Sequence, residues 1–184
     1  ARSRNCKVVF INQFGFERSL CGDRMPADMH FSDIRKGSDV EFGQSIYEPF
    51  GIAQLEALSF GSICVMSRAC GCAGFVERIA GPNGTPNVIV ADYSGYRAEP
   101  DTIEAYKSLT GQQREVFEDE VARRAAKEIL SRLPTTREEK AAFVRRGYEL
   151  ADRMSWDAVA REMILPALRK ITAGPSIRVA PMPS

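Results

Sequence analysis

The chain has 184 residues and a formal net charge of +1, and 44% of its residues are hydrophobic. This length suits a domain with a buried core, and the balanced charge excludes the basic footprint of a nucleic-acid-binding protein. No apolar run approaches the roughly eighteen residues of a membrane span, and residues 1–15 lack the pattern of a signal peptide.

The cysteine pattern argues against structural cross-links. The five cysteines are Cys6, Cys21, Cys64, Cys70 and Cys72. Because their number is odd and no CxxC pair occurs, we expect neither a disulfide framework nor a metal site, and we expect a reducing, cytoplasmic location. Cys64 lies in the apolar run ICVM and is expected in the core. His30, the single histidine, has no partner motif for catalysis and is expected at the surface.

Four short strands are predicted in the first half of the chain. Residues 7–11, KVVFI, form a β-branched apolar run typical of a buried parallel strand. Residues 12–38 predict mainly loop with a turn or two of helix, and residues 38–45 predict a second strand. Further strands are predicted at 62–67 and 87–94. Strands that alternate with helices favour an α/β fold with a parallel sheet, which binds ligands at the carboxyl ends of its strands.

A buried helix is expected between the second and third strands. Ile52, Leu55, Leu58 and Ser59 recur at three- and four-residue spacing, and Gly61 is a C-cap that ends the helix. After the third strand, Gly71 is expected in a turn, flanked by Cys70 and Cys72, whose thiols are not expected to be reactive.

The start of the helix at residue 52 is the candidate site. Pro49 fixes φ and Gly51 permits close backbone approach, so unpaired N–H groups are expected to point outward there. The helix dipole adds partial positive charge, and a diphosphate can be held by the backbone alone. Glu48 precedes the first turn and Glu56 lies eight residues on. We expect both carboxylates to face one cleft and to accept hydrogen bonds from sugar hydroxyls.

Beyond residue 100 the pattern predicts helices throughout. The first, DTIEAYKSL, follows Pro100. A long helix at 112–133 carries an apolar face that consists of Phe117, Val121, Ala125 and Ile129. Pro134 ends it.

Two more helices complete the helical part. Thr136 and Glu139 form a capping box for a helix that runs to about Arg153. Its expected apolar side comprises Phe143, Val144, Tyr148 and Ala151. Ser155 caps the last helix, in which Trp156 is expected to pack in the core and Pro166 to cause a kink.

Three stretches of the sequence resemble one enzyme family. The stretch EPFGIAQLEALSFG, with seven residues between Glu48 and Glu56, resembles the E-x7-E signature of retaining GT-B glycosyltransferases, the glycogen-synthase-like and related families. The stretch SICVMSRACGCAGFVE resembles the strand and glycine turn that follow, although the chain has Gly71, Cys72, Ala73 and Gly74 in place of adjacent glycines. The stretch YELADRMSWDAVAREMILPALRKI resembles the Trp-bearing C-terminal helices of these enzymes.

The resemblance implies a role for each site residue. Glu48 would be the catalytic carboxylate that touches the donor sugar hydroxyls, and Glu56 would bind the ribose hydroxyls. Backbone amides around Gly51 would hold the phosphates. The implied donor-binding residues are Glu48, Phe50, Gly51, Ile52, Glu56, Gly71 and Cys72. The implied reaction transfers a sugar from a nucleotide-sugar donor to a carbohydrate or other hydroxyl acceptor with retention, and it uses no metal or other cofactor.

The resemblance also implies the architecture. The expected fold is a Rossmann-like parallel sheet with helices on both faces, followed by an all-helical C-terminal segment. Residues 1–173 would form part of a GT-B C-terminal nucleotide-sugar-binding domain, with the sheet in 1–100, the helices in 101–173 and a Pro-rich tail at 174–184. The family's N-terminal acceptor domain has no counterpart in these residues. We therefore expect either a fragment of a larger enzyme or a chain that works beside a second polypeptide.

Two alternatives remain open from the sequence. A non-catalytic nucleotide-sugar-binding or regulatory module would keep both carboxylates and the helix start but would never meet an acceptor. A different GT-B-type enzyme, such as an epimerase or a phosphorylase relative, is disfavoured by EPFGIAQLE and by the lack of a cofactor lysine motif. Arg68 and Arg97 lie near predicted turns and are expected to be solvated surface charges.

Overall fold

The computed structural model describes residues 6–9, 18–22, 25–43, 45, 47–93 and 102–173. The chain divides into two compact units, Ala1–Ser38 and Asp39–Ser184. We call them the N-terminal unit and the C-terminal unit and describe each by itself.

The N-terminal unit contains two short helices, α1 (Arg18–Cys21) and α2 (Phe31–Lys36). His30 is exposed at the start of α2, as expected, and its backbone N–H donates a 2.8 Å hydrogen bond to Asp33 Oδ2. The predicted buried strand at 7–11 is wrong where it can be checked, because residues 7–9 have no regular structure and Val8 is 85% exposed. Residues 10 and 11 lie outside the described residues. Apolar β-branched composition alone does not make a strand, since a strand needs a hydrogen-bonded neighbour.

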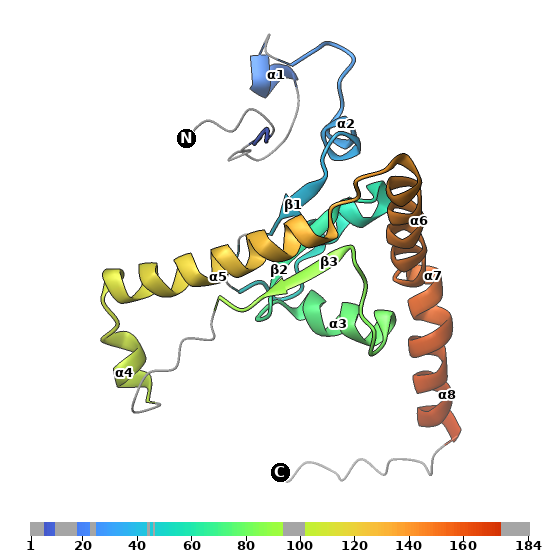
Figure 1. Cartoon of the computed structure of the whole chain (residues 1–184). Coiled ribbons are helices and arrows are strands. Elements are labelled where there is room, and N and C mark those ends of the chain that lie inside the picture. Colours follow the sequence, from blue (N-terminus) through green and yellow to red (C-terminus); the bar gives the residue numbers. More distant parts are fainter. Residues whose placement is uncertain are drawn as a thin grey trace. The chain divides into compact units, whose positions relative to one another are not determined.

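The C-terminal unit is built on a small parallel sheet (Figure 1). Its strands are β1 (Val40–Phe42), β2 (Ile63–Ser67) and β3 (Val88–Ala91), in the order β1-β2-β3. Both neighbouring pairs are parallel. These strands confirm three of the four predictions and the α/β class of the fold.

Strand β2 is the centre of the core and is buried along its whole length. Its side chains alternate between two hydrophobic clusters because successive residues of a strand point to opposite faces. Cys64 and Met66 pack in the cluster that includes α3, whereas Ile63 and Val65 pack in the cluster that includes α5. The predicted core position of Cys64 is confirmed.

The connection from β1 to β2 differs from the predicted helix. It forms two short 3₁₀ helices, η2 (Ile52–Gln54) and η3 (Glu56–Phe60). Leu58 of the predicted apolar face is fully buried, but Ile52 is 67% exposed. Gly61 ends η3 in the left-handed conformation with φ +79°, which confirms the predicted cap.

Helix α3 (Gly71–Ala80) follows β2 directly. The glycine turn predicted at 71–74 is therefore wrong: Gly71 and Gly74 lie within the first turns of this helix. Cys72, Ala73 and Val76 are buried at helical spacing, and this periodicity was present in the sequence.

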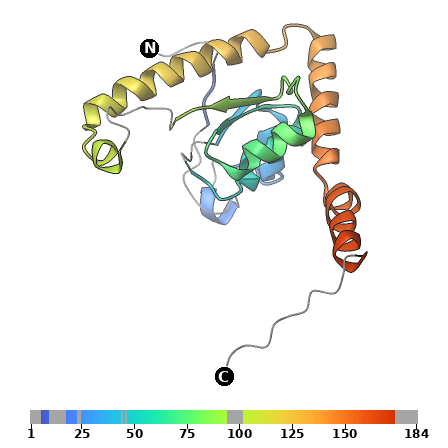
Figure 2. The same ribbon diagram turned by 90° about the horizontal axis from the view of Figure 1, so that it is seen from below.

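The rest of the described chain, residues 102–173, is helical (Figures 1 and 2). The helices are α4 (Ile103–Lys107), α5 (Gly111–Arg132), α6 (Arg137–Arg153), α7 (Trp156–Val159), the π-helical segment η4 (Ala160–Ile164) and α8 (Leu165–Ala173). Figure 2 shows the corner between α5 and α6, which is the loop that contains Pro134. The predicted apolar face of α5 is confirmed, since Val121, Ala125 and Ile129 are buried.

The caps of the last helices match the prediction, but some apolar faces do not. Thr136 accepts from the N–H of Glu139, and Ser155 accepts from the N–H of Ala158.

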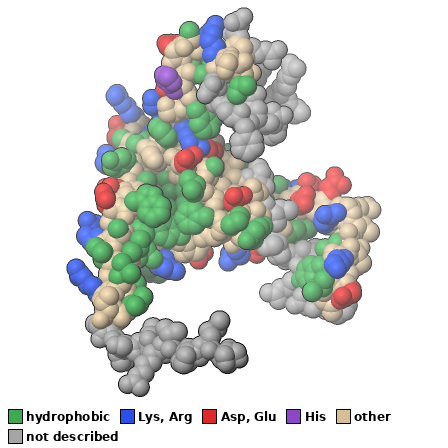
Figure 3. Space-filling view, turned by 180° about the vertical axis from the view of Figure 1, so that it is seen from behind, with side chains coloured by type: hydrophobic (Ala, Val, Ile, Leu, Met, Phe, Trp, Pro, Cys, Tyr) green, Lys and Arg blue, Asp and Glu red, His purple; other side chains and the backbone are tan. Residues whose placement is uncertain are grey.

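The predicted core position of Trp156 is wrong, because its side chain is 82% exposed. Figure 3 shows hydrophobic side chains at the surface of the molecule. In α6, Val144 and Tyr148 of the predicted apolar side are exposed, and Gly147 and Leu150 are buried instead.

Helix α6 packs closely against η3 because Gly147 has no side chain at the crossing. A Cβ atom at Gly147 would lie 2.5 Å from the carbonyl oxygen of Leu58. The π-helical segment η4 ends two residues before Pro166. A proline clashes with the preceding turn of an α-helix, which explains why the irregularity lies at the predicted kink.

Candidate functional site

The loop that follows β1 lies at the carboxyl end of the sheet, where parallel α/β folds bind ligands. Gly43 continues the ladder beyond β1, since its N–H donates a 2.8 Å hydrogen bond to the carbonyl oxygen of Val65. The described part of the loop then runs from Tyr47 to Gly51 and enters η2. The sequence EPFG is therefore placed at the carboxyl end of β1.

Two backbone hydrogen bonds join this loop to the start of α3. The N–H of Gly71 donates to the carbonyl oxygen of Glu48 (3.2 Å), and the N–H of Cys72 donates to that of Phe50 (2.8 Å). Gly71 is required for this approach, because a Cβ atom there would lie 2.1 Å from the carbonyl oxygen of Pro49. Four of the predicted site residues are thus held together by backbone contacts.

These bonds also occupy the start of α3. The first N–H groups of an α-helix have no partner within the helix, and here Glu48 and Phe50 supply the acceptors. The next amide, that of Ala73, donates to the carbonyl oxygen of Cys70 at 3.1 Å. The start of α3 is therefore closed by protein.

The start of η2 is not the helix terminus that the sequence predicted. A 3₁₀ helix of three residues, capped by Gly51, has no aligned run of peptide dipoles comparable with that of a long α-helix. The helix-dipole part of the prediction is wrong for this reason. Gly51 has φ +89° and ψ +56°, and Ile52 continues in right-handed 3₁₀ geometry.

A left-handed residue followed by a right-handed one turns successive N–H groups toward one point, an arrangement called a nest. Within the described residues, the N–H groups of Gly51, Ile52 and Ala53 make no hydrogen bond. Ile52 and Ala53 are exposed. This loop therefore offers the exposed amides of Ile52 and Ala53 to an anion without a helix dipole, whereas Gly51 is buried.

The two predicted carboxylates lie in different surroundings. Glu48 is partly buried in the loop, whereas Glu56 is exposed at the first position of η3. That they share one cleft remains a prediction.

Cys72 is buried beneath the loop. Its Sγ lies 3.6 Å from Gln54 Oε1. Burial, with smaller contributions from Cys70 and Glu48, raises the pKa of the Cys72 thiol to about 11. The thiol is therefore protonated at neutral pH and is no nucleophile, in agreement with the sequence expectation.

Gln54 is a site residue that the sequence reasoning missed. Its side chain is buried. A Cβ atom added at Gly43 would lie 2.3 Å from Gln54 Cγ, and one added at Gly51 would lie 3.0 Å from Gln54 Oε1. The amide side chain thus links the end of β1 to the loop and to Cys72. The available signal was an amide side chain inside a helix that the sequence predicted to be buried, since a buried amide needs a specific partner.

Two cavities lie on other parts of the C-terminal unit. The larger, about 470 Å³, lies between β1 and α5, and the smaller, about 270 Å³, lies along β3 and α5. Neither is lined by Glu48, Glu56 or Gly51. Arg68 lines the smaller cavity, is exposed as expected, and pairs with Asp92 at 3.5 Å. Arg97 lies outside the described residues.

The described residues contain no group of three or more His, Cys, Asp or Glu side chains that is suitable for a metal ion. The described cysteines are free thiols. None of the described helices is long and apolar enough to cross a membrane.

Comparisons with protein-family models, with curated proteins and with solved structures returned no match.

Proposed function

We propose that the chain binds a nucleotide sugar and is the donor-binding part of a retaining GT-B glycosyltransferase, which transfers the sugar to an acceptor hydroxyl. The observation that carries the proposal is the junction of the EPFG loop with the start of α3 at the carboxyl end of the sheet. This junction brings together Glu48, Phe50, Gly51, Gly71 and Cys72, which the family resemblance selects from two separate stretches of sequence.

The diphosphate would be held by the backbone nest. The amides of Gly51, Ile52 and Ala53 make no hydrogen bond with described residues, and Ile52 and Ala53 are exposed whereas Gly51 is buried. Phosphate oxygens are strong acceptors for such convergent donors. These donors would also stabilise the diphosphate as it leaves during sugar transfer, since oriented dipoles act where charge develops.

The carboxylates would bind hydroxyl groups. Glu48 is adjacent to the nest in sequence and partly buried, which suits contact with the donor sugar near its anomeric carbon. Glu56 would bind the ribose hydroxyls. In this proposal the three-stranded sheet is part of a Rossmann-like sheet with helices on both faces, and the chain functions in the cytoplasm together with an acceptor-binding domain.

Calorimetric titration with UDP-glucose, ADP-glucose and GDP-mannose tests the proposal. We expect saturable binding of one donor, and we expect Glu56→Ala to weaken it by about 1–3 kcal/mol through the loss of charge-assisted hydrogen bonds. Glu77→Ala, at an exposed position of α3, is the control and should leave the affinity unchanged.

The nest is tested by Gly51→Ala. A side chain strains the left-handed backbone and should lower donor affinity at least about tenfold, which is about 1.4 kcal/mol. Gly84→Ala is the matched control, because Gly84 also has a positive φ and has no atom within 4 Å of its Cβ position. Failure of all three donors to bind, or equal affinities in both glycine variants, would refute nucleotide-sugar binding at this loop.

Binding and transfer are separate outcomes. Donor binding together with sugar transfer to a glucan or a simple glycoside, lost in Glu48→Gln, would establish the enzyme. Donor binding without transfer, measured in the presence of the complementing acceptor domain, would identify a binding or regulatory module instead.

A further inference from the structure

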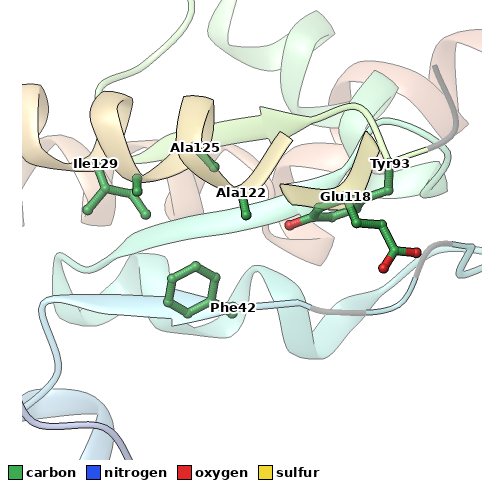
Figure 4. Close-up of a pocket in the computed structure, with 7 residues that line it drawn as sticks. Phe42, Tyr93, Glu118, Ala122, Ala125 and Ile129 are labelled. Carbon is green, nitrogen blue, oxygen red and sulfur yellow. The ribbon is translucent and has the colours of Figure 1, made fainter. Parts of the chain in front are cut away.

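The cavity between β1 and α5 lies apart from the EPFG loop and has its own chemistry (Figure 4). Its volume of about 470 Å³ is within the range of small-molecule sites. Phe42 at the end of β1 faces α5 across the cavity, and Tyr93 lies at one end near Glu118 (Figure 4).

The cavity exists because α5 packs on β3 and does not reach β1, and the side chains with which α5 lines the space are small. Register pairs Phe42 with Val65, so Phe42 is on the face of the sheet on which α5 packs. Helix α5 contacts β3 closely, and it lines the cavity with three alanines, Ala122, Ala125 and Ala126. The methyl groups of these alanines do not fill the space, and the Phe42 side chain is 51% exposed.

The polar groups of the cavity are a carboxylate and a phenol. Neither the Glu118 carboxylate nor the Tyr93 hydroxyl makes a hydrogen bond or ion pair with another described residue. Burial raises the pKa of Tyr93, so its hydroxyl stays protonated at neutral pH. No Lys or Arg lines the cavity among the described residues. Both the carboxylate and the electron-rich faces of the two rings attract cations.

We propose that this cavity binds a small planar aromatic amine, whose ring lies between Phe42 and the alanines of α5 and whose ammonium group faces Glu118. An aromatic ring gains offset or edge-to-face contact with a phenylalanine ring beyond the burial of its area, which an aliphatic chain does not. Anionic ligands, including the phosphates of a nucleotide, are repelled by Glu118. The site is therefore independent of the proposed donor site.

Titration with tryptamine, followed by ligand-observed NMR and calorimetry, tests this site. The neutral analogue indole and the anionic analogue indole-3-acetate are the controls for charge. We expect tryptamine to bind saturably, indole to bind more weakly and indole-3-acetate not to bind. Glu118→Gln keeps the size of the side chain and should weaken tryptamine about tenfold while leaving indole unchanged, as expected for loss of a charge-assisted hydrogen bond.

A cavity-filling variant tests the location. Ala122→Leu places a larger side chain in the cavity at an exposed helix position, where folding is not threatened, and should abolish binding of tryptamine and indole. Ala141→Leu, at an exposed position of α6, is the control and should bind as the parent chain does.

Three results would overturn the assignment. They are equal binding of tryptamine and indole-3-acetate, unchanged tryptamine binding in Ala122→Leu, and no binding of tryptamine to the parent chain. If Ala122→Leu changes the sedimentation of the chain instead of tryptamine binding, the cavity is an interface between copies and the small-molecule site is wrong.

Discussion

The backbone N–H of Cys72 donates a 2.8 Å hydrogen bond to the carbonyl oxygen of Phe50. This contact joins the first turn of α3 to the loop after β1, although Phe50 and Cys72 are 22 positions apart in the sequence. Backbone bonds of this kind do not depend on side-chain chemistry. The shape of the loop therefore depends on how closely the two segments can approach.

Gly71→Ala should disrupt this approach. The added Cβ atom would lie 2.1 Å from the carbonyl oxygen of Pro49, so the loop must move. We expect a loss of about 1–3 kcal/mol in the free energy of unfolding, as for overpacked cores, and weaker binding of the nucleotide sugar. Urea denaturation and calorimetry measure the two effects. Gly74→Ala in the same helix has no atom within 4 Å of its Cβ and should be neutral or stabilising by up to about 1 kcal/mol; equal stability of the two variants would contradict the close approach.

Gly147→Ala should separate α6 from η3. Alanine favours a helix over glycine by about 1 kcal/mol, but its Cβ would lie 2.5 Å from the carbonyl oxygen of Leu58. We expect the clash to prevail and the midpoint of urea denaturation to fall. Gly111→Ala, at the start of α5, meets no atom within 4 Å and serves as the control. A stabilised Gly147→Ala variant would show that the crossing is looser than described.

Arg132→Ala should destabilise the start of β3. Arg132 Nη1 donates to the carbonyl oxygens of Thr85 (3.2 Å) and Val88 (2.6 Å), and Nη2 pairs with Glu128. The side chain is only 28% exposed, so we expect a loss of about 1–3 kcal/mol in the free energy of unfolding. The control is Arg123→Ala.

Arg123 pairs with Asp119 at 3.3 Å on the same helix, but both side chains are largely exposed. Exposed pairs of this type contribute about 0.5 kcal/mol or less. Thermal and urea denaturation of the two variants measure the difference. If Arg123→Ala cost as much as Arg132→Ala, the hydrogen bonds to the backbone would not be the cause.

Stability should fall at alkaline pH because of Cys72. In the unfolded chain a cysteine thiol loses its proton near a pKa of about 8.5, whereas burial raises the pKa of folded Cys72 to about 11. Between these values the unfolded state binds fewer protons, so the free energy of unfolding decreases as pH rises. Burial also raises the pKa of Tyr93, and its titration adds to the decrease at the upper end of the range.

Urea denaturation from pH 7.5 to pH 10.5 measures this dependence. Cys72→Ala should flatten it, and Tyr93→Phe should flatten only its upper part. An unchanged pH profile in Cys72→Ala would show that this thiol is not protected from solvent.

Local patterns in the sequence predicted the elements whose cause is local. The apolar run at 62–67 matches β2, and the spacing of Val121, Ala125 and Ile129 matches the buried face of α5. The capping box of Thr136 and Glu139 matches the start of α6, because the cap and its partner are three residues apart. Such contacts form within one or two turns and need no other part of the chain.

The errors arise where distant segments decide the outcome. Residues 7–9 have the composition of a strand but have no strand structure. Trp156 has the composition of a core residue but is exposed. Helix α3 was missed because Gly71 and Gly74 suggest a turn, and Gly71 is in fact required by the approach of Pro49.

For the candidate site, the sequence by itself determined that the EPFG stretch follows a strand of a parallel sheet, and the chemical roles of its residues stay predictions. Only the tertiary structure decided that the loop meets α3, that its free amides belong to a nest at Gly51 and not to a long helix, and that Gln54 lies beneath it. The physical reason is that strand and helix periodicity is local, whereas burial and backbone approach depend on segments that are far apart in the sequence.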